Sequence, residues 1–457
     1  MPKMFARGQI IDLTVTGLGS TGEGVGKTEG FTVFAVGALP GENVKVKLNI
    51  VKKNYAKGQV IKIVQASPYR VEPKCPVYKQ CGGCQLQHLS YEQQLAMKRQ
   101  HVIDALERIG HCENLQVEPV LGEKDPWHYR NKMQVPVAQG AKGKLAIGCF
   151  AAATHKVIDV ESCLIQNELN NKLAQIVRGW MKKYGITAMD ENTHKGMVRH
   201  IMGRVGVQTG EVMAVLITNV PKVPRLEELG QMLAQGVTGF TTLVQNINTK
   251  PNNIILGMEN KVITGPGFIK DKLGTFTFNI SPLSFFQVNT KQAEVLYGKA
   301  LEFAELTGQE NVVDVYCGTG TITLFLAQKA KAALGIEIVP EAIQDAKENA
   351  KNNNVSNVNF ICGDAAKELP KLAKEGVRLD VIVLDPPRAG CEGTVLEAIA
   401  EVAPKKVVYV SCNPASLARD VAILRDKGYA LQKVQPVDMF PQSSHVESVC
   451  LMSRVQK

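Results

Sequence analysis

The stretch Lys406-Val407-Val408-Tyr409-Val410-Ser411-Cys412-Asn413-Pro414 indicates the fold of the C-terminal part of the chain. The β-branched apolar run predicts a buried strand, which the polar residues and the proline end abruptly. A helical pattern follows from residue 415 to 427. Cys412 therefore stands at the carboxyl edge of a sheet, where α/β enzymes place reacting groups. A thiol there, near a helix N-terminus, can have its pKa lowered; alternatively, Cys412 is an ordinary small buried residue.

Strand-like segments precede this stretch and alternate with helical patterns. They cover residues 311–315, 332–336, 358–362 and 381–384. Such alternation, starting near residue 280, predicts a doubly wound parallel sheet. A final alternating run, 446–455, is expected to close one edge of it.

Polar or glycine-rich turns follow these strands at one edge of the sheet. The first is Asp314-Val315-Tyr316-Cys317-Gly318-Thr319-Gly320, a nucleotide-binding arrangement that lacks the full dinucleotide spacing. Glu337 ends the next strand, where a carboxylate binds ribose hydroxyls. Gly363-Asp364 ends the third, and Asp385-Pro386-Pro387-Arg388 follows the fourth. Each could be a simple turn, but together they predict a cofactor site, and Asp-Pro-Pro is typical of S-adenosylmethionine enzymes that act on a planar base.

Residues 1–66 form short alternating segments separated by glycine-rich turns, which predicts a five-stranded barrel of the oligonucleotide-binding (OB) kind. The pair Gly22-Glu23-Gly24-Val25-Gly26 and Ala38-Leu39-Pro40-Gly41-Glu42 resembles a TRAM domain, an RNA-binding barrel. The net charge of the chain is +10, and residues 1–70 hold ten Lys or Arg against four Asp or Glu. A basic module favours nucleic acid as the partner, although a solvated basic face would have the same composition.

Three cysteines lie close together in Cys75-Pro76-Val77-Tyr78-Lys79-Gln80-Cys81-Gly82-Gly83-Cys84. This spacing predicts a metal site, and a four-thiolate site needs one more ligand. Cys163 is the candidate, with Cys112 and Cys149 as competitors. The chemistry of the residues leaves zinc and an iron–sulfur cluster both open.

The composition is that of a globular protein with two or three domains, at 457 residues, 45% hydrophobic and 21% charged. The first ten residues hold no signal peptide and the chain no long apolar run, so a cytoplasmic protein without membrane segments is expected. The eleven cysteines are then expected to be reduced. Residues 90–109 and 167–184 show helical patterns, and the aromatic and basic residues of 127–132 form a candidate RNA-contact band.

Several of these motifs, in order, resemble the uracil-5-methyltransferases of RNA, in particular the bacterial 23S ribosomal RNA branch with a TRAM domain. The motifs are Ser284-Phe285-Phe286-Gln287-Val288-Asn289, the segment 314–320, Asp385-Pro386-Pro387-Arg388, Ser411-Cys412-Asn413-Pro414 and His445-Val446-Glu447-Ser448-Val449. The resemblance implies a class I (Rossmann-like) α/β methyltransferase domain at 280–457, an OB-like TRAM barrel at 1–66 and a central α+β cluster-binding domain at 67–279. It also implies that helix 90–110 packs on the catalytic domain.

The same resemblance implies the ligands and the partner. The cofactors are S-adenosyl-L-methionine and a [4Fe-4S] cluster, rather than zinc, bound by Cys75, Cys81, Cys84 and Cys163. The residues lining the cofactor and target-base pocket are Gln287, Tyr316, Thr321, Glu337, Asp364 and Asp385. At Thr321 and Asp364 this chain departs from the family pattern, because relatives have other polar residue types there. The partner is 23S ribosomal RNA, with transfer RNA as the alternative, and the expected state is a monomer.

The chemistry of uracil explains the catalytic residues. Carbon 5 is too weak a nucleophile until a thiolate adds to carbon 6, and Cys412 is the candidate thiolate. Gln287 and Arg388 are candidate donors to the enolate oxygen. Glu447 is the expected base for the carbon-5 proton, with His445 as the alternative. The rival functions are a cytosine-5 methyltransferase and a non-catalytic RNA-binding factor of ribosome assembly.

Overall fold

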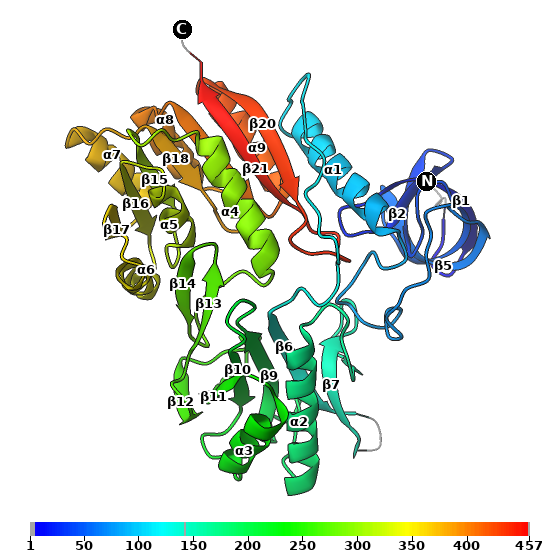
Figure 1. Ribbon diagram of the computed structural model, residues 1–457. Helices are drawn as coiled ribbons and strands as arrows, with labels where there is room; N and C mark the ends of the chain where they lie inside the picture. The colour runs from blue at the N-terminus through cyan, green and yellow to red at the C-terminus, as the bar shows by residue number, and fades with distance from the viewer. Residues whose placement is uncertain (1–4, 141–142, 456–457) are drawn as a thin grey trace.

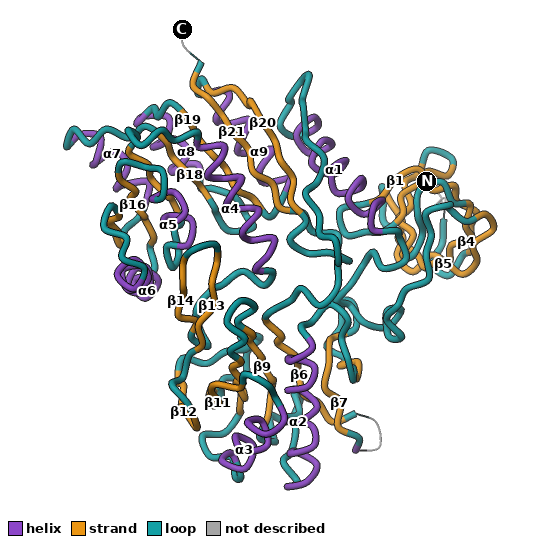
Figure 2. The backbone as a smooth tube through the Cα atoms, in the orientation of Figure 1, coloured by secondary structure: helices purple, strands orange, loops and turns teal. Residues whose placement is uncertain are grey.

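The computed structural model describes residues 5–140 and 143–455, and they form three lobes (Figure 1). The N-terminal barrel is blue, the central lobe is green, and the catalytic lobe runs from yellow to red. Helix α1 (Tyr91–Arg108) lies between the barrel and the catalytic lobe. Figure 2 shows that long loop segments, in teal, connect the three lobes.

The N-terminal strands close into a barrel in the order β1-β2-β3-β5-β4, which confirms the predicted TRAM-like barrel. Their bounds are β1 Ile10–Leu18, β2 Gly24–Thr28, β3 Phe31–Val36, β4 Asn43–Val51 and β5 Tyr55–Gln65. Strand β2 was not expected, because its glycines read as a turn. Glycine is needed there: a Cβ on Gly26 would lie 2.2 Å from the Thr14 carbonyl oxygen, so only glycine allows the strands of this small barrel to approach.

The central lobe is a sheet in the order β12-β11-β10-β9-β6-β7-β8, with two helices packed against it. The bounds are β6 Lys132–Gln139, β7 Leu145–Phe150, β8 Val157–Asp159, α2 Glu168–Tyr184, β9 Val198–Val205, β10 Val212–Thr218, α3 Leu226–Gly236, β11 Phe240–Ile247 and β12 Glu259–Thr264. A hairpin, β13 Ile269–Leu273 and β14 Phe276–Ile280, leads out of this lobe. The ring of Phe276 lies 5.7 Å from that of Phe325, so the hairpin packs on the catalytic lobe.

The catalytic sheet has the order β17-β16-β15-β18-β19-β21-β20. All its strands are parallel except β21, which pairs antiparallel with both β19 and β20. Its elements are α4 Thr290–Ala304, β15 Asn311–Val315, α5 Thr321–Ala327, β16 Ala332–Glu337, α6 Pro340–Asn352, β17 Val358–Cys362, α7 Ala365–Lys374, β18 Val381–Leu384, α8 Gly393–Val402, β19 Lys406–Ser411, α9 Pro414–Asp426, β20 Tyr429–Val437 and β21 Glu447–Arg454. Apolar side chains cover both faces of this sheet, as expected for a doubly wound fold.

The final strand does not lie where the sequence predicted it. β21 sits inside the sheet between β19 and β20, and β20 forms the edge. The sequence did not predict β20, because its Lys and Gln residues interrupt the alternation of apolar and polar residues that marks a strand. Residues 117 and 121 bridge to Val434 and Val437 of β20, so the segment after α1 covers part of this edge.

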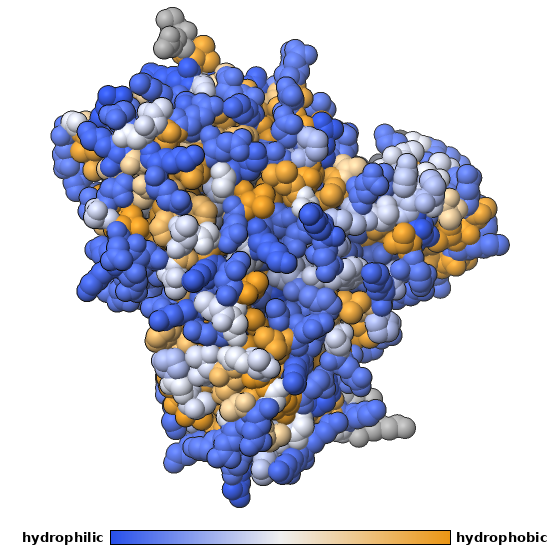
Figure 3. Space-filling view, viewed as in Figure 1, coloured by the Kyte–Doolittle hydropathy of each residue, from blue (hydrophilic) through white to orange (hydrophobic). Residues whose placement is uncertain are grey.

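Helix α1 packs on the catalytic lobe although it precedes the central sheet in the chain. Val102 and Leu106 are fully buried in the cluster that includes Leu417 and Val421 of α9. On the face seen in Figure 3, hydrophilic residues predominate and apolar residues occur in small groups. Within residues 5–140 and 143–455, no helix combines the length and the apolar character needed to cross a membrane.

Candidate active site

The order of the catalytic sheet creates a switch point between β15 and β18, because the chain proceeds from β15 to β16 on one side and later continues from β18 to β19 on the other. Ligands of open α/β sheets bind outside the carboxyl ends of the strands at this point. The register pairs Val315 with both Ile336 and Leu384. The next residues along these strands, Tyr316, Glu337 and Asp385, therefore come together at one edge.

Strand register also joins Cys412 to Glu447. Ser411 at the end of β19 pairs with Ser448 of β21. The next position along β19 is Cys412, and the preceding position of β21 is Glu447. The antiparallel pairing therefore places the expected nucleophile and the expected base beside each other, although they are far apart in the sequence.

Cys412 also lines a groove of about 1220 Å³ between the barrel, α1 and the catalytic lobe. Arg388 and His445 line this groove as well, and so does the barrel segment Thr16–Thr21. The side chain and backbone around Cys412 are held firmly: Asn413 and Ser416 both donate to the Arg388 carbonyl oxygen, at 3.1 and 3.2 Å. The groove exceeds the roughly 300–1,000 Å³ of small-molecule sites, so its size suits part of a polymer.

The pKa of Cys412 is raised to about 11. Burial is the largest cause, the facing carboxylates of Glu447 and Asp385 add to it, and the Arg388 guanidinium opposes it. This corrects the expectation that the nearby helix would lower the pKa. The N-terminus of α9 is already capped by Asn413, whose side chain accepts from the Ala415 N–H. In the free protein, the thiol therefore holds its proton at neutral pH.

Glu447 and Asp385 form a desolvated carboxyl pair. Burial and the neighbouring Asp385 raise the pKa of Glu447 to about 8. Burial raises the pKa of Asp385 to about 7. Neither carboxyl has a lysine or arginine partner among the ion pairs of the described residues. Groups with such shifted pKa values can exchange protons with a substrate at neutral pH.

Tyr297 of α4 connects the two parts of the site. Its hydroxyl lies close to the side chains of Thr321 and Gln287, and its pKa is raised by burial and by the nearby Asp385 and Glu447. Gln287 and Thr321 thus lie beside the carboxyl pair. The sequence did not single out Tyr297, because it lies in an ordinary amphipathic helix pattern.

The glycine turn after β15 fits a cofactor. Gly318 has φ +53° and a Cβ built on it would meet no atom within 4 Å, so the turn borders open space. The Gly318 N–H donates to Glu337 at 3.2 Å, and Glu337 also accepts from the N–H groups of Ile338 and Val339. Asp314 is buried with an unpartnered carboxyl oxygen, and burial raises its pKa to about 7. A charged residue inside an apolar strand was the sequence signal for Asp314.

Tyr316 and Asp364 lie at the rim of this turn. Tyr316 has a left-handed backbone, φ 67°, and its hydroxyl contacts Cys391 in the loop after β18. Asp364 caps α7 through one oxygen, which accepts from the Ala366 N–H at 3.0 Å. Its other oxygen lies 3.7 Å from the Lys367 ammonium.

The four predicted metal ligands share one cavity. Cys75, Cys81, Cys84 and Cys163 line a space of about 370 Å³, and so does Cys149. Cys112 does not line this cavity. It follows α1 in the chain and lies against Arg425 of α9. In the part of the chain that the structure describes, however, no three His, Cys, Asp or Glu side chains come close enough to hold one metal ion. The metal-binding prediction is thus not supported by the structure.

The predicted RNA-contact band, made of the aromatic and basic residues of 127–132, is wrong for Tyr129. Tyr129 and Asn131 are buried. The Tyr129 hydroxyl donates to the Pro441 carbonyl oxygen at 3.0 Å, and the Asn131 side chain donates to the Gln287 carbonyl oxygen at 2.8 Å. These polar groups were needed inside the protein because irregular backbone there lacks other hydrogen-bond partners.

Comparison with known proteins identifies the fold and the family. Residues 251–455 match the family model described as tRNA (uracil-5-)-methyltransferase, and residues 5–61 match the TRAM domain. An "uncharacterized RNA methyltransferase" of Clostridium tetani is 51% identical over 97% of this chain and 96% of its own length. One of Bacillus cereus is 49% identical over 99% of this chain and 98% of its own length.

A solved structure covers nearly the whole chain. The Pyrococcus abyssi tRNA (uracil-54, C5)-methyltransferase, in complex with S-adenosyl-L-homocysteine, is 26% identical, with a TM-score of 0.77. The match covers 97% of this chain and 100% of that chain. The catalytic lobe thus has the fold of an S-adenosyl-L-methionine-dependent methyltransferase, and the glycine turn with its carboxylates fits that cofactor. The chain belongs to the family of RNA uracil-5-methyltransferases that carry a TRAM domain.

Proposed function

We propose that this protein methylates carbon 5 of a specific uridine in 23S ribosomal RNA, with Cys412 as the nucleophile and Glu447 as the base. The observation that carries the proposal is the position of Cys412. Its thiol faces Asp385 and Glu447 on one side and lines the groove on the other. A uracil that enters from the groove can therefore reach the thiol and the carboxyl pair together.

S-Adenosyl-L-methionine, when bound, supplies the methyl group as a substituent of its sulfonium. Gln287, Tyr316, Thr321, Glu337, Asp364 and Asp385 would hold this cofactor and the base. The positive sulfonium would stabilise the ionised forms of Asp385 and Glu447, whose pKa values burial raises. Gln287 is tied through its carbonyl oxygen to Asn131, which keeps its segment in place.

Cys412 adds to carbon 6 of the uracil through its sulfur, and as this bond forms the thiol proton passes to the facing carboxylate of Asp385. The enolate oxygen receives hydrogen bonds from Arg388 or Gln287. After carbon 5 has taken the methyl group, Glu447 accepts the carbon-5 proton, the double bond re-forms and the sulfur leaves. A uracil stacked in a duplex exposes neither face, so the target base must be flipped out or lie in a loop.

The pH dependence of the reaction follows from these groups. Cys412 and Glu447 must both be deprotonated, and their pKa values lie at about 11 and about 8. We expect kcat/KM for RNA to rise with pH from about 6 to about 10, and more steeply below about 8 than above it, because Glu447 loses its proton near 8 while Cys412 still holds its own there. This ratio reports the free enzyme. Initial rates of methyl transfer in a constant-ionic-strength buffer series would measure it. A flat or falling profile would contradict the assigned proton transfers.

The identity of the RNA is the part of the proposal that needs a direct experiment. The resemblance of the motifs to the 23S ribosomal RNA branch favours ribosomal RNA, whereas the names of the matching family model and of the Pyrococcus abyssi relative favour transfer RNA. Mass mapping of 5-methyluridine in both RNA classes, from cells with and without this protein, separates the two. Loss of one 5-methyluridine from 23S RNA supports the proposal. Loss from transfer RNA alone would show that transfer RNA, and not 23S RNA, is the substrate.

The proposal includes a structural [4Fe-4S] cluster on Cys75, Cys81, Cys84 and Cys163. What supports it is that these four thiols line one cavity. Zinc draws all four sulfurs to about 2.3 Å from one ion, whereas a cluster takes one thiolate on each of its irons and leaves them further apart. Spread thiols around a common space therefore fit a cluster better than a single ion.

Anaerobically purified protein is expected to contain iron and sulfide, and Cys163→Ser is expected to lose most of both, because a missing thiolate exposes one iron. Cys112→Ser is the matched control, because its thiol lies against Arg425, outside the cavity. Metal analysis and visible absorbance measure the outcome. Zinc in place of iron would refute the cluster, and unchanged folding and RNA affinity after iron loss would refute its structural role.

A further inference from the structure

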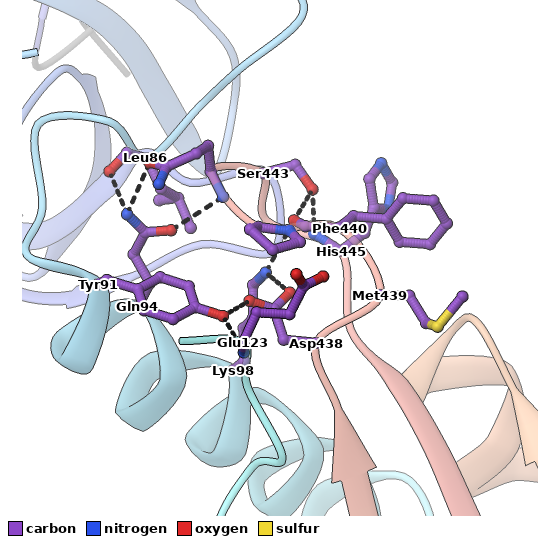
Figure 4. Close-up of polar contacts among 12 residues, drawn as sticks. Leu86, Tyr91, Gln94, Lys98, Glu123, Asp438, Met439, Phe440, Ser443 and His445 are labelled. Atoms are coloured by element: carbon purple, nitrogen blue, oxygen red, sulfur yellow. Dashed lines mark hydrogen bonds and ion pairs between the residues drawn. The ribbon is translucent and has the colours of Figure 1, made fainter. Parts of the chain in front are cut away.

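The loop 438–446 connects β20 to β21 and leads directly into Glu447. It also carries His445 (Figure 4). The loop has no helix or strand of its own, so its backbone needs partners elsewhere. Side chains and N–H groups from distant segments supply them: the carbonyl oxygens of Met439, Phe440, Pro441 and Gln442 accept from Asn289, Lys98, Tyr129 and the N–H groups of Gln85 and Leu86, respectively.

A buried ion pair joins α1 to the start of this loop. The Lys98 Nζ lies 2.5 Å from Asp438 Oδ1, and both side chains are fully buried, at 0% exposure. The same ammonium donates to the Phe440 carbonyl oxygen at 3.1 Å. The second carboxylate oxygen accepts from the Tyr91 hydroxyl at 2.9 Å. Asp438 is therefore held by two residues of one helix, which Figure 4 shows side by side.

The middle of the loop is held by α1 as well. Gln94 and Gln442 bond reciprocally: the Gln94 side-chain amide donates to the Gln442 side chain at 3.0 Å, and the Gln442 backbone N–H donates back at 3.1 Å. Gln442 has a left-handed backbone, φ 69°. Such a conformation costs about 1–3 kcal/mol in a non-glycine residue, so the surrounding contacts must maintain it.

The loop is also linked to the cofactor side of the site. The Asn289 side chain donates to the Met439 carbonyl oxygen at 3.2 Å and to Glu123. Asn289 lies two residues after Gln287 and caps α4, the helix that carries Tyr297. The Glu123 N–H donates to the Tyr91 hydroxyl at 3.0 Å. One hydrogen-bonded chain thus runs from α1 through the loop to the segment beside Gln287.

Stability alone does not explain a fully buried lysine. Removing an ion pair from water costs several kcal/mol per ion, and apolar residues of similar volume often stabilise a protein as well or better. The charged pair instead fixes the geometry of the contact, because a charge-assisted hydrogen bond is short and requires its donor and acceptor to be aligned. A loop that must deliver a carboxyl to one place benefits from such fixed bonds.

We propose that Lys98, with Asp438 and Tyr91, positions the loop 438–446 so that Glu447 stands at the carbon-5 proton of the methylated base. This inference rests on the proposed function, since it assumes the role of Glu447. Lys98 touches neither substrate nor cofactor in this scheme, so it is a positioning residue. Its loss should slow proton removal and leave RNA binding and the earlier Cys412 addition nearly unchanged.

The test uses the full-length double variant Lys98→Met/Asp438→Leu, which removes both charges and leaves no buried ion unpaired. The control is Lys299→Met, which breaks a partly exposed ion pair with Glu302 at 2.7 Å on α4. The substrate is ribosomal and transfer RNA from cells that lack this protein. We expect kcat to fall about 100-fold, as for a misplacement of about 1 Å, with KM within about twofold.

The decisive readout is the covalent protein–RNA adduct on natural uridine, resolved on a denaturing gel. The double variant should accumulate it at steady state, whereas wild type and Lys299→Met should not. Unchanged kcat in a double variant whose melting temperature matches wild type would overturn the inference, and so would a lower kcat without adduct. Absence of any adduct between wild type and 5-fluorouridine RNA would instead refute the proposed function.

Discussion

Replacing Cys412 by alanine is expected to abolish methyl transfer, with a loss of about 10⁴-fold or more in kcat. Carbon 5 of uracil cannot accept the methyl group until a nucleophile has added to carbon 6, and no other cysteine lies along the described lining of the groove. Transfer of labelled methyl groups to RNA from cells lacking the protein measures the loss. The variant should also form no adduct with 5-fluorouridine RNA, which traps the wild-type enzyme.

The control for this variant is Cys112→Ala. Cys112 is buried against Arg425, away from the groove, so its removal tests whether losing any buried thiol matters. If Cys412→Ala restored every effect of the protein in cells that lack it, the protein would act as a non-catalytic RNA-binding factor. Methylation by the variant at a rate close to that of the wild type would show that the sulfur is not the nucleophile.

Replacing Glu447 by glutamine is expected to stop the reaction one step later. The amide cannot accept the carbon-5 proton, so the methylated base should stay attached to Cys412, and turnover should fall about 10³-fold. A labelled methyl group would then remain bound to protein on a denaturing gel. If His445 were the base, Glu447→Gln would turn over and a His445 variant would trap the adduct.

The same variant should change stability in a pH-dependent manner. The folded protein holds a proton on Glu447 up to about pH 8, whereas the unfolded chain releases it near its ordinary value of 4.5. Between these values, stability therefore falls as the pH rises. Glutamine has no proton to hold, so Glu447→Gln should raise the melting temperature at pH 8 and leave it nearly unchanged at pH 4.

An exposed glutamate provides the comparison for that measurement. Glu348→Gln, on the solvent face of α6, should shift the melting temperature little at either pH. An equal shift in the two glutamine variants would mean that the burial of Glu447 does not govern its pKa. Thermal unfolding followed by circular dichroism at the two pH values distinguishes these results.

The sequence by itself determined the elements and the strand-end motifs of the catalytic lobe. Apolar runs of four or five residues are local signals, so the strands at 311–315, 358–362 and 381–384 lie within the same bounds in the structure. The closed barrel was also accessible, because alternation and turn glycines are properties of neighbouring residues. Motif order was enough to identify the family, and three of the motifs, at 314–320, 385–388 and 411–414, lie where a strand ends.

Tertiary structure alone decided how these pieces face one another. Only the antiparallel register of β19 and β21 brings Cys412 beside Glu447, and that burial, with two carboxylates, raises the thiol pKa that the helix was expected to lower. The helical pattern of residues 90–109 gives no sign that Lys98 differs from the other polar residues of this helix, yet Lys98 is fully buried against Asp438. Desolvation and long-range pairing depend on segments that are separate in the chain, by 340 residues for Lys98 and Asp438, so no local pattern of residues could have specified them.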